Sequence, residues 1–209
     1  MDSNNEYPER DKTNESTKDR ILFVSINLFS QSGYNEVSMR DISKAVGIKA
    51  SSIYNHYKSK QAILDAIFEF YDEQWNAAAP DIDNLLQLAE TEPPDVVLKN
   101  MLFDWKPELQ EIMNRIYVIA TREAMVNPES LDLINTLVME RVKPRPRLLL
   151  GRLLELGKIE PIDIEAFVNI LSHVSHSATS LNLTPLRIEG EIWLRCWNML
   201  TSLIKPTGK

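Results

Sequence analysis

The segment Ser38–Lys60 constrains the fold of this chain most, because it predicts two short helices joined by a tight turn. Ser38 and Asp41 form a capping box, in which the serine hydroxyl accepts from an early backbone N–H and the carboxylate reaches back to the cap. Gly47 follows the apolar residues of the first helix, where a left-handed backbone favours a residue without a Cβ. The second helix is expected over Ala50–Asn55, with Ile53 directed inward.

Two helices in this arrangement are the layout of a helix-turn-helix, whose second helix enters the major groove of DNA. Small groups and hydrogen-bond donors on its outer face suit base edges, and Lys58 and Lys60 beside a helix N-terminus suit a phosphate. The side chains expected at the DNA-facing surface are Ser38, Arg40, Lys49, Ala50, Ser51, Ser52, Tyr54, Asn55, His56, Tyr57, Lys58 and Lys60. The expected base readers among them are Lys49, Ser51, Ser52 and Asn55. The hairpin alone fits an ordinary pair of packed helices equally well.

The longer segment Thr17–Tyr71 resembles the DNA-binding domain of the TetR family of bacterial transcriptional regulators. Many positions agree in one register, and the resemblance covers about a quarter of the chain. The matching residues are Leu28-Phe29, Gly33-Tyr34, Ser38-Met39-Arg40-Asp41-Ile42, Gly47-Ile48, Ile53-Tyr54, His56-Tyr57 and Lys58-Ser59-Lys60. One departure is Tyr57, which stands where the family often has Phe.

This resemblance implies an all-α protein, with an N-terminal three-helix DNA-binding domain and a C-terminal helical domain for ligand binding and dimerisation. It further implies a dimeric repressor that binds a palindromic operator in double-stranded DNA and is released by a small-molecule effector. A helical protein of the same fold that binds a protein partner is the alternative, and an enzyme is a distant third. The residues do not identify the effector or the operator, nor do they distinguish repression from activation.

The distribution of charge agrees with a DNA-binding segment at the N-terminal side. The chain of 209 residues has a net charge of −7, but residues 17–60 hold seven Lys or Arg against three Asp or Glu. A locally basic module on an acidic body can bind phosphates, while the body repels DNA from other surfaces. A single cysteine, Cys196, excludes an intramolecular disulfide and fits a reducing cytosol. No run is long enough to span a membrane, so we expect a cytoplasmic protein.

The predicted organisation has three parts. Residues 1–16 are polar and without periodicity, which predicts a disordered arm. Residues 17–60 form the DNA-binding domain, with the helix-turn-helix at about 37–56, and residues 61–209 form the effector-binding and dimerisation domain. The helices expected outside the helix-turn-helix are 17–31, 60–78, 81–90, 94–104, 107–126, 128–142, 147–156, 162–182 and 187–204. The run KPRPR at 143–147 is expected to be a solvated loop rather than a second basic patch.

The C-terminal part predicts binding surfaces but no chemistry. The helices at about 162–182 and 187–204 have wide apolar faces, which favours a homodimer across a two-fold axis, although internal packing would use the same residues. Candidate effector-lining residues are Trp75, Phe103, Met113, Tyr117, Arg122 and His173, with core packing as the alternative. His173 and His176 have a spacing compatible with a metal, but no cysteine or acidic cluster completes such a site. We therefore expect no metal, no cofactor and no catalytic residue.

Overall fold

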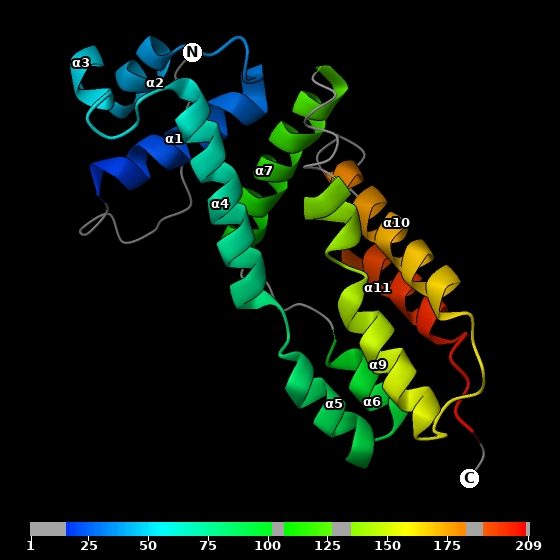
Figure 1. Ribbon diagram of the computed structural model, residues 1–209. Coiled ribbons are helices and arrows are strands. Elements are labelled where there is room, and N and C mark those ends of the chain that lie inside the picture. The colour runs from blue at the N-terminus through cyan, green and yellow to red at the C-terminus, as the bar shows by residue number, and fades with distance from the viewer. Residues whose placement is uncertain (1–15, 102–106, 127–134, 183–189, 208–209) are drawn as a thin grey trace. The chain divides into compact units, whose positions relative to one another are not determined.

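The computed structural model describes residues 16–101, 107–126, 135–182 and 190–207 (Figure 1). Within these ranges every regular element is a helix, apart from one isolated bridge between Ile159 and Pro206. The prediction of an all-α fold is therefore confirmed. The chain divides into two compact units, and each is described by itself below.

Unit 1 is formed by the described residues of Met1–Glu73 and Lys106–Arg122. It holds the helices α1 (Thr17–Ser32), α2 (Met39–Val46) and α3 (Ala50–Ile53), with most of α4 (Lys60–Ala78) and α7 (Pro107–Val126). Figure 1 shows α1, α2 and α3 gathered at the N-terminal end of α4. Each helix contributes fully buried apolar side chains, which are Ile21, Ile26, Phe29, Ile42, Ile53, Ile63, Ile67, Ile116 and Ile119. Their burial supplies the main driving force for this unit.

Helix α1 is fixed at both ends by local chemistry. Ser16 and Asp19 form a second capping box at its start. At its other end Gly33 has a φ of 93°, and its N–H donates to the carbonyl of Phe29 at 2.9 Å. A side chain with a Cβ would be strained at that φ, which explains why a glycine ends the helix here.

Unit 2 is formed by the described residues of Gln74–Trp105 and Glu123–Lys209. It contains α5 (Ile82–Thr91), α6 (Pro94–Lys99), a short π-helix η1 (Asn135–Glu140), α9 (Pro144–Glu155), α10 (Ile164–Asn182) and α11 (Gly190–Thr201). Helix α9 packs against both α5 and α10, and its Leu149, Leu150 and Leu153 are fully buried. They lie in one apolar cluster with residues of α5, α6, α10 and α11, among them Phe167 and Trp197.

Several predicted boundaries need correction. The 94–104 helix ends at Lys99, and the 187–204 helix is described from Gly190 to Thr201. Most of the predicted 128–142 helix lies outside the described residues, as does the predicted arm at 1–15. The prediction of a loop at 143–147 was wrong, because Pro144 and Pro146 lie in the first turn of α9. Backbone N–H groups of a first turn have no partner within the helix, so proline loses nothing there. In the described part of the chain, no helix is long and apolar enough to cross a membrane.

Candidate nucleic-acid interface

The first helix of the helix-turn-helix begins at the predicted capping box. The Ser38 hydroxyl accepts a hydrogen bond from the N–H of Asp41 at 3.2 Å, and the N–H of Ser38 donates to the Asp41 carboxylate at 2.9 Å. Hydrogen bonds from the Ser38 hydroxyl and backbone lower the pKa of Asp41 below its ordinary value of 3.8. The carboxylate is thus held in its charged form at the positive end of α2.

The turn between α2 and α3 is closed by a glycine and by an arginine from α1. Gly47 has the left-handed backbone (φ 78°, ψ 31°) that the sequence predicted for it, and the N–H of Ile48 donates to Ser43 at 3.0 Å. The guanidinium of Arg20 donates to the carbonyl of Val46 at 2.7 Å. A cation at a helix C-terminus is favourable both as a donor and against the helix dipole. The sequence pattern did not reveal this contact, because it joins residues 26 positions apart.

The second helix is shorter than predicted. Helix α3 ends at Ile53, and the next residues form tighter turns in which Asn55 donates to Ser52 and His56 to Ile53. Ile53 is fully buried, as predicted from its position. A short helix with an exposed outer side still presents consecutive residues to a groove.

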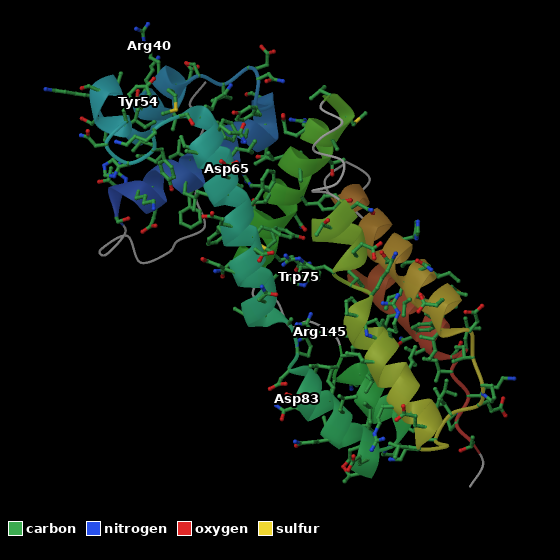
Figure 2. The ribbon with its side chains drawn as sticks, viewed as in Figure 1. Arg40, Tyr54, Asp65, Trp75, Asp83 and Arg145 are labelled. Atoms are coloured by element: carbon green, nitrogen blue, oxygen red, sulfur yellow. The ribbon has the colours of Figure 1, made fainter. Side chains whose placement is uncertain are left out.

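Most members of the predicted DNA-facing set are exposed. Tyr54 has 48% of its surface exposed, and Figure 2 shows Arg40 extending outward from α2. The remaining exposed members are Ser38, Lys49, Ala50, Ser51, Asn55, His56 and Lys58, while Ser52 and Lys60 are half-buried. Tyr57 differs from all of these, because it is only 6% exposed and burial raises the pKa of its hydroxyl. The role of the predicted DNA-facing residues in DNA binding stays a prediction.

The cations of this surface differ in what they contact within the protein. The side chains of Arg40, Lys44 and Lys49 are exposed and make no hydrogen bond or ion pair with any described residue. Lys58 is exposed and donates to the carbonyl of Tyr54 at 3.2 Å. Lys60 donates to three backbone carbonyls, the nearest being Tyr34 at 2.7 Å. Lys44 was not singled out in the sequence, although its spacing of four from Arg40 on a helix places the two on one face.

The predicted effector residues fall in both units. Met113 and Tyr117 are buried and belong to unit 1. Arg122 also belongs to unit 1, where its guanidinium donates to the carbonyls of Ser30 at 2.7 Å and Gln31 at 3.2 Å. Its contact with an anionic effector stays a prediction, but in this structure it holds the end of α1. No sequence pattern signals this contact, which joins residues 92 positions apart.

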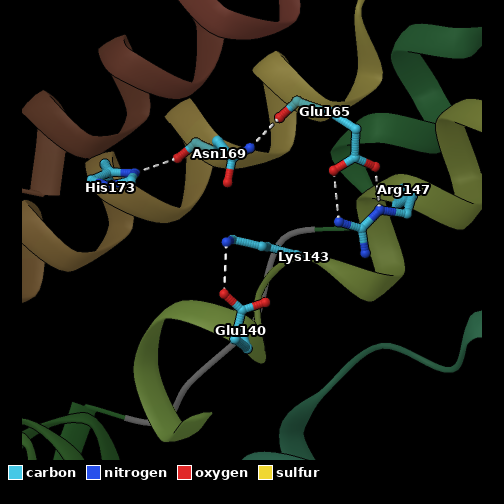
Figure 3. Close-up of polar contacts among 6 residues, drawn as sticks. All are labelled: Glu140, Lys143, Arg147, Glu165, Asn169 and His173. Carbon is cyan, nitrogen blue, oxygen red and sulfur yellow. Dashed lines mark hydrogen bonds and ion pairs between the residues drawn. The ribbon is translucent and has the colours of Figure 1, made fainter. Parts of the chain in front are cut away.

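The other three effector candidates fall outside unit 1. Trp75 is half-buried in the part of α4 that belongs to unit 2, and Phe103 lies outside the described residues. His173 is exposed, and its Nδ1 lies 2.7 Å from the carbonyl of Asn169 (Figure 3). The described residues contain no group of three His, Cys, Asp or Glu that could hold a metal ion.

The basic run at 143–147 is engaged within unit 2. Lys143 pairs with Glu140 at 2.8 Å, and Arg147 makes two hydrogen bonds to Glu165, at 2.6 and 2.9 Å (Figure 3). Arg145 donates to the carbonyl of Pro80 at 3.2 Å. Because each of these cations has a partner inside the unit, the run offers little to a second DNA surface.

Comparisons with known proteins point to one family. Residues 21–67 match the family model described as bacterial regulatory proteins, tetR family. The negative transcriptional regulator IcaR of the biofilm operon icaADBC in Staphylococcus aureus (strain Newman) is 29% identical over 103 residues, which are 48% of this chain and 52% of that protein. IcaR of Staphylococcus epidermidis is 48% identical over 46 residues, 22% of this chain and 25% of that protein. The chain thus spans about half the length, or less, of the curated relatives it matches.

Solved structures of low sequence identity share the fold over nearly the whole chain. The ketosteroid transcriptional regulator KstR2 of Mycobacterium tuberculosis aligns with a TM-score of 0.64 and 16% identity, covering 92% of this chain and 96% of that one. A transcriptional regulator from Saccharomonospora viridis in complex with choline has a TM-score of 0.58 and 20% identity, with 88% and 95% covered. The family matched by residues 21–67 consists of regulatory proteins, which agrees with the expectation that the chain is not an enzyme. The segment 21–67, which contains the helix-turn-helix, thus matches the tetR family of bacterial regulatory proteins, and the chain as a whole shares the fold of solved transcriptional regulators.

Proposed function

We propose that this protein is a dimeric transcriptional repressor that binds a palindromic operator through α2 and α3 and is released by a small-molecule effector. The observation that carries the proposal is the exposed outer side of the helix-turn-helix. The side chains of Arg40, Lys44 and Lys49 make no hydrogen bond or ion pair with any described residue, while the cations at 143–147 are all engaged. Exposed cations without internal partners are the groups that can release counterions from DNA. Binding to chromosomal DNA would place the protein in the cytoplasm.

Two kinds of contact are proposed for this surface. Arg40 and Lys44 lie on the first helix, which in helix-turn-helix proteins crosses the phosphate backbone. Lys49, Ser51 and Asn55 lie in or beside α3 and would meet base edges in the major groove. The first kind gives affinity for any DNA, and the second gives the choice of sequence.

Repression and release are proposed from the relatives. The Staphylococcus relatives are named as negative regulators, which favours repression over activation. One structural neighbour is a transcriptional regulator in complex with choline, which supports a small-molecule effector for this fold. An effector can release DNA only by binding more tightly to a conformer that does not fit the operator. We keep Trp75, Phe103, Met113, Tyr117, Arg122 and His173 as candidate effector contacts.

Dimerisation is proposed through α10 and α11. Ile170 on α10 and Met199 on α11 are large apolar side chains with 48% and 62% of their surfaces exposed. Burying such residues against a second copy would remove apolar surface from water. A dimer would place two recognition helices about 34–36 Å apart, which sets the spacing of the operator half-sites.

The test is a selection of bound sequences from random double-stranded DNA. The wild-type protein should enrich an inverted repeat whose half-sites are about one helical turn apart. Lys49→Ala, Ser51→Ala or Asn55→Ala should each change the preferred base at particular positions, at a cost of about 1–3 kcal/mol there. Lys205→Ala is the control, because this exposed cation of unit 2 has no proposed contact with DNA. If the wild-type protein enriches no sequence, the proposal of a sequence-specific DNA-binding repressor is wrong.

A further inference from the structure

Helix α3 has few interactions of its own that fix its direction. It consists of the four residues Ala50–Ile53, and its N-cap residue Lys49 makes no side-chain capping hydrogen bond. Ile53 is the only one of these four residues that is buried. Because an isolated helix of this length is unstable in water, the segments on either side of α3 must hold it in place.

The segment before α3 is held by Arg20 of α1. The last four carbonyls of a helix have no partner within that helix. At the end of α2, the carbonyl of Ser43 accepts from the N–H of Ile48 at 3.0 Å, which closes the turn. The carbonyl of Val46 accepts from the Arg20 guanidinium at 2.7 Å, and it has no other hydrogen bond within the described part of the chain. Arg20 therefore ties this turn to α1.

The segment after α3 is held by the same part of α1. Tyr57 is only 6% exposed, and its N–H donates to the carbonyl of Ile53 at 3.0 Å. The Lys18 ammonium lies 5.6 Å from the centre of the Tyr57 ring, a distance at which a cation is attracted to an aromatic face. Lys18 and Arg20 both belong to the first turn of α1, which the capping box at Ser16 fixes. The first turn of α1 thus contacts the chain on both sides of α3.

The bond from Arg20 is the stronger of these two contacts. It is a charge-assisted hydrogen bond, and its acceptor lies at the C-terminal end of α2, where the helix carries partial negative charge. Val46 itself is only 3% exposed, so the bond ends on a packed part of the unit. The proposed base readers Lys49, Ser51 and Asn55 follow within nine residues. Base contacts depend on the placement of individual hydrogen-bonding groups, so a shift of the turn would weaken them.

We propose that Arg20 is a positioning residue for sequence recognition, which holds the Val46 carbonyl and so fixes the turn at 47–49 and the direction in which α3 faces the base edges. Arg20 acts through this turn, and the role does not require it to contact a base. The proposal rests on the proposed function. It gives α1 a part in the choice of DNA sequence, in addition to α2 and α3.

The experiment compares Arg20→Gln with Arg40→Gln as a matched control. Each variant removes one positive charge from an exposed position of unit 1, but the Arg40 side chain makes no hydrogen bond or ion pair with any described residue. Glutamine is a good helix former, and its amide nitrogen ends two bonds closer to the backbone, so the bond to Val46 is lost. Affinity for an operator selected by the wild-type protein and for random double-stranded DNA is measured at several salt concentrations, on variants that melting curves show to be folded.

The first readout is the ratio of operator affinity to random-DNA affinity. Arg20→Gln should lower this ratio about tenfold, the scale of one misplaced base contact. Arg40→Gln should weaken binding to both DNAs and keep the wild-type ratio, because phosphate contacts do not depend on sequence. The second readout is amide hydrogen exchange in the free protein. The N–H of Ile48 should exchange faster in Arg20→Gln than in wild type, and at the wild-type rate in Arg40→Gln.

Two outcomes would overturn the proposal. A wild-type affinity ratio in Arg20→Gln, whatever the loss of overall affinity, would limit Arg20 to phosphate binding or to stability. A lowered ratio with unchanged exchange at Ile48 would mean that Arg20 affects the choice of sequence without acting through the turn.

Arg20→Met is the second variant, in case Arg20→Gln does not fold. It also removes the charge and the donor but keeps an unbranched apolar stem, and the same two readouts decide the result in the same way. If the wild-type protein selects no sequence at all, the proposed function fails, which is a different result from either outcome for the variants.

Discussion

Six cations of unit 1 form two groups that differ in what their charges contact. Arg20, Lys60 and Arg122 donate to backbone carbonyls, and two of them, Arg20 and Arg122, do so at the C-terminal end of a helix. Arg40, Lys44 and Lys49 are exposed and have no such partner among the described residues. All six count equally toward the net charge of the sequence. Local charge therefore indicates a DNA-binding segment, whereas the contacts of each cation indicate whether it is available to DNA.

The largest expected effect follows from removing two cations without partners. Arg40→Ala combined with Lys44→Ala should weaken binding to operator and random DNA alike. The slope of log affinity against log salt should become shallower by about 1.8, since each lost phosphate contact contributes about 0.9. Thermal unfolding should stay close to wild type, because exposed side chains without contacts contribute little to stability. An unchanged salt slope would show that Arg40 and Lys44 do not contact DNA phosphates. The absence of internal partners would then not indicate which cations bind DNA.

A smaller effect is expected from an engaged cation. Arg122→Met keeps much of the side-chain stem but removes the donor to the carbonyls of Ser30 and Gln31. We expect a loss of about 0.3–1 kcal/mol in the free energy of unfolding, the usual value of a cation at a helix C-terminus. Chemical denaturation measures this loss, and the salt slope of DNA binding should not change. A shallower salt slope of DNA binding with unchanged stability would contradict this, because it would show that Arg122 contacts DNA rather than the end of α1.

The smallest effect concerns an anion engaged in the same way at the start of α2. Hydrogen bonds from Ser38 lower the pKa of Asp41, so its carboxylate stabilises the folded state fully above the ordinary pKa of 3.8. This contribution is lost as the pH falls through the lowered pKa. Asp41→Asn should therefore flatten the acid limb of stability against pH, measured by denaturation below pH 5. Ser38→Ala should have the same effect, and the double variant should add little. Parallel profiles for wild type and Asp41→Asn would contradict this.

Local features of the fold were predictable from the sequence. The capping box at Ser38, the left-handed Gly47 and the Ser59 cap depend on residues within four positions of one another. The bounds of α4 and α7 agree with the prediction, because the apolar periodicity and the flanking residues signal both ends. The error at 143–147 arose because proline was interpreted as a helix breaker, although it is tolerated in a first turn.

Long-range contacts of the candidate site were not predictable. Lys60 is expected to bind phosphate because of its charge beside a helix start, and this stays a prediction. Its carbonyl partners lie 23 to 26 positions earlier in the chain, and no periodicity or cap signal joins the two segments. Tyr57 was expected at the DNA-facing surface because it follows the recognition helix, yet the turn after Ile53 directs it inward. Such outcomes depend on packing between segments, which residue patterns within one segment do not encode.

The composition of unit 1 from two separate segments has a consequence for evolution and engineering. A chimeric regulator is usually designed by joining a DNA-binding domain to a different ligand-binding domain at a single boundary in the sequence. Here Ile116 and Ile119 belong to the same unit as α1, and Arg122 holds its end. A fragment that stops after α3 would lack α7, so a transferred DNA-binding unit would have to include the described residues of both Met1–Glu73 and Lys106–Arg122. During synthesis, unit 1 can complete its folding only after residues up to 122 have left the ribosome.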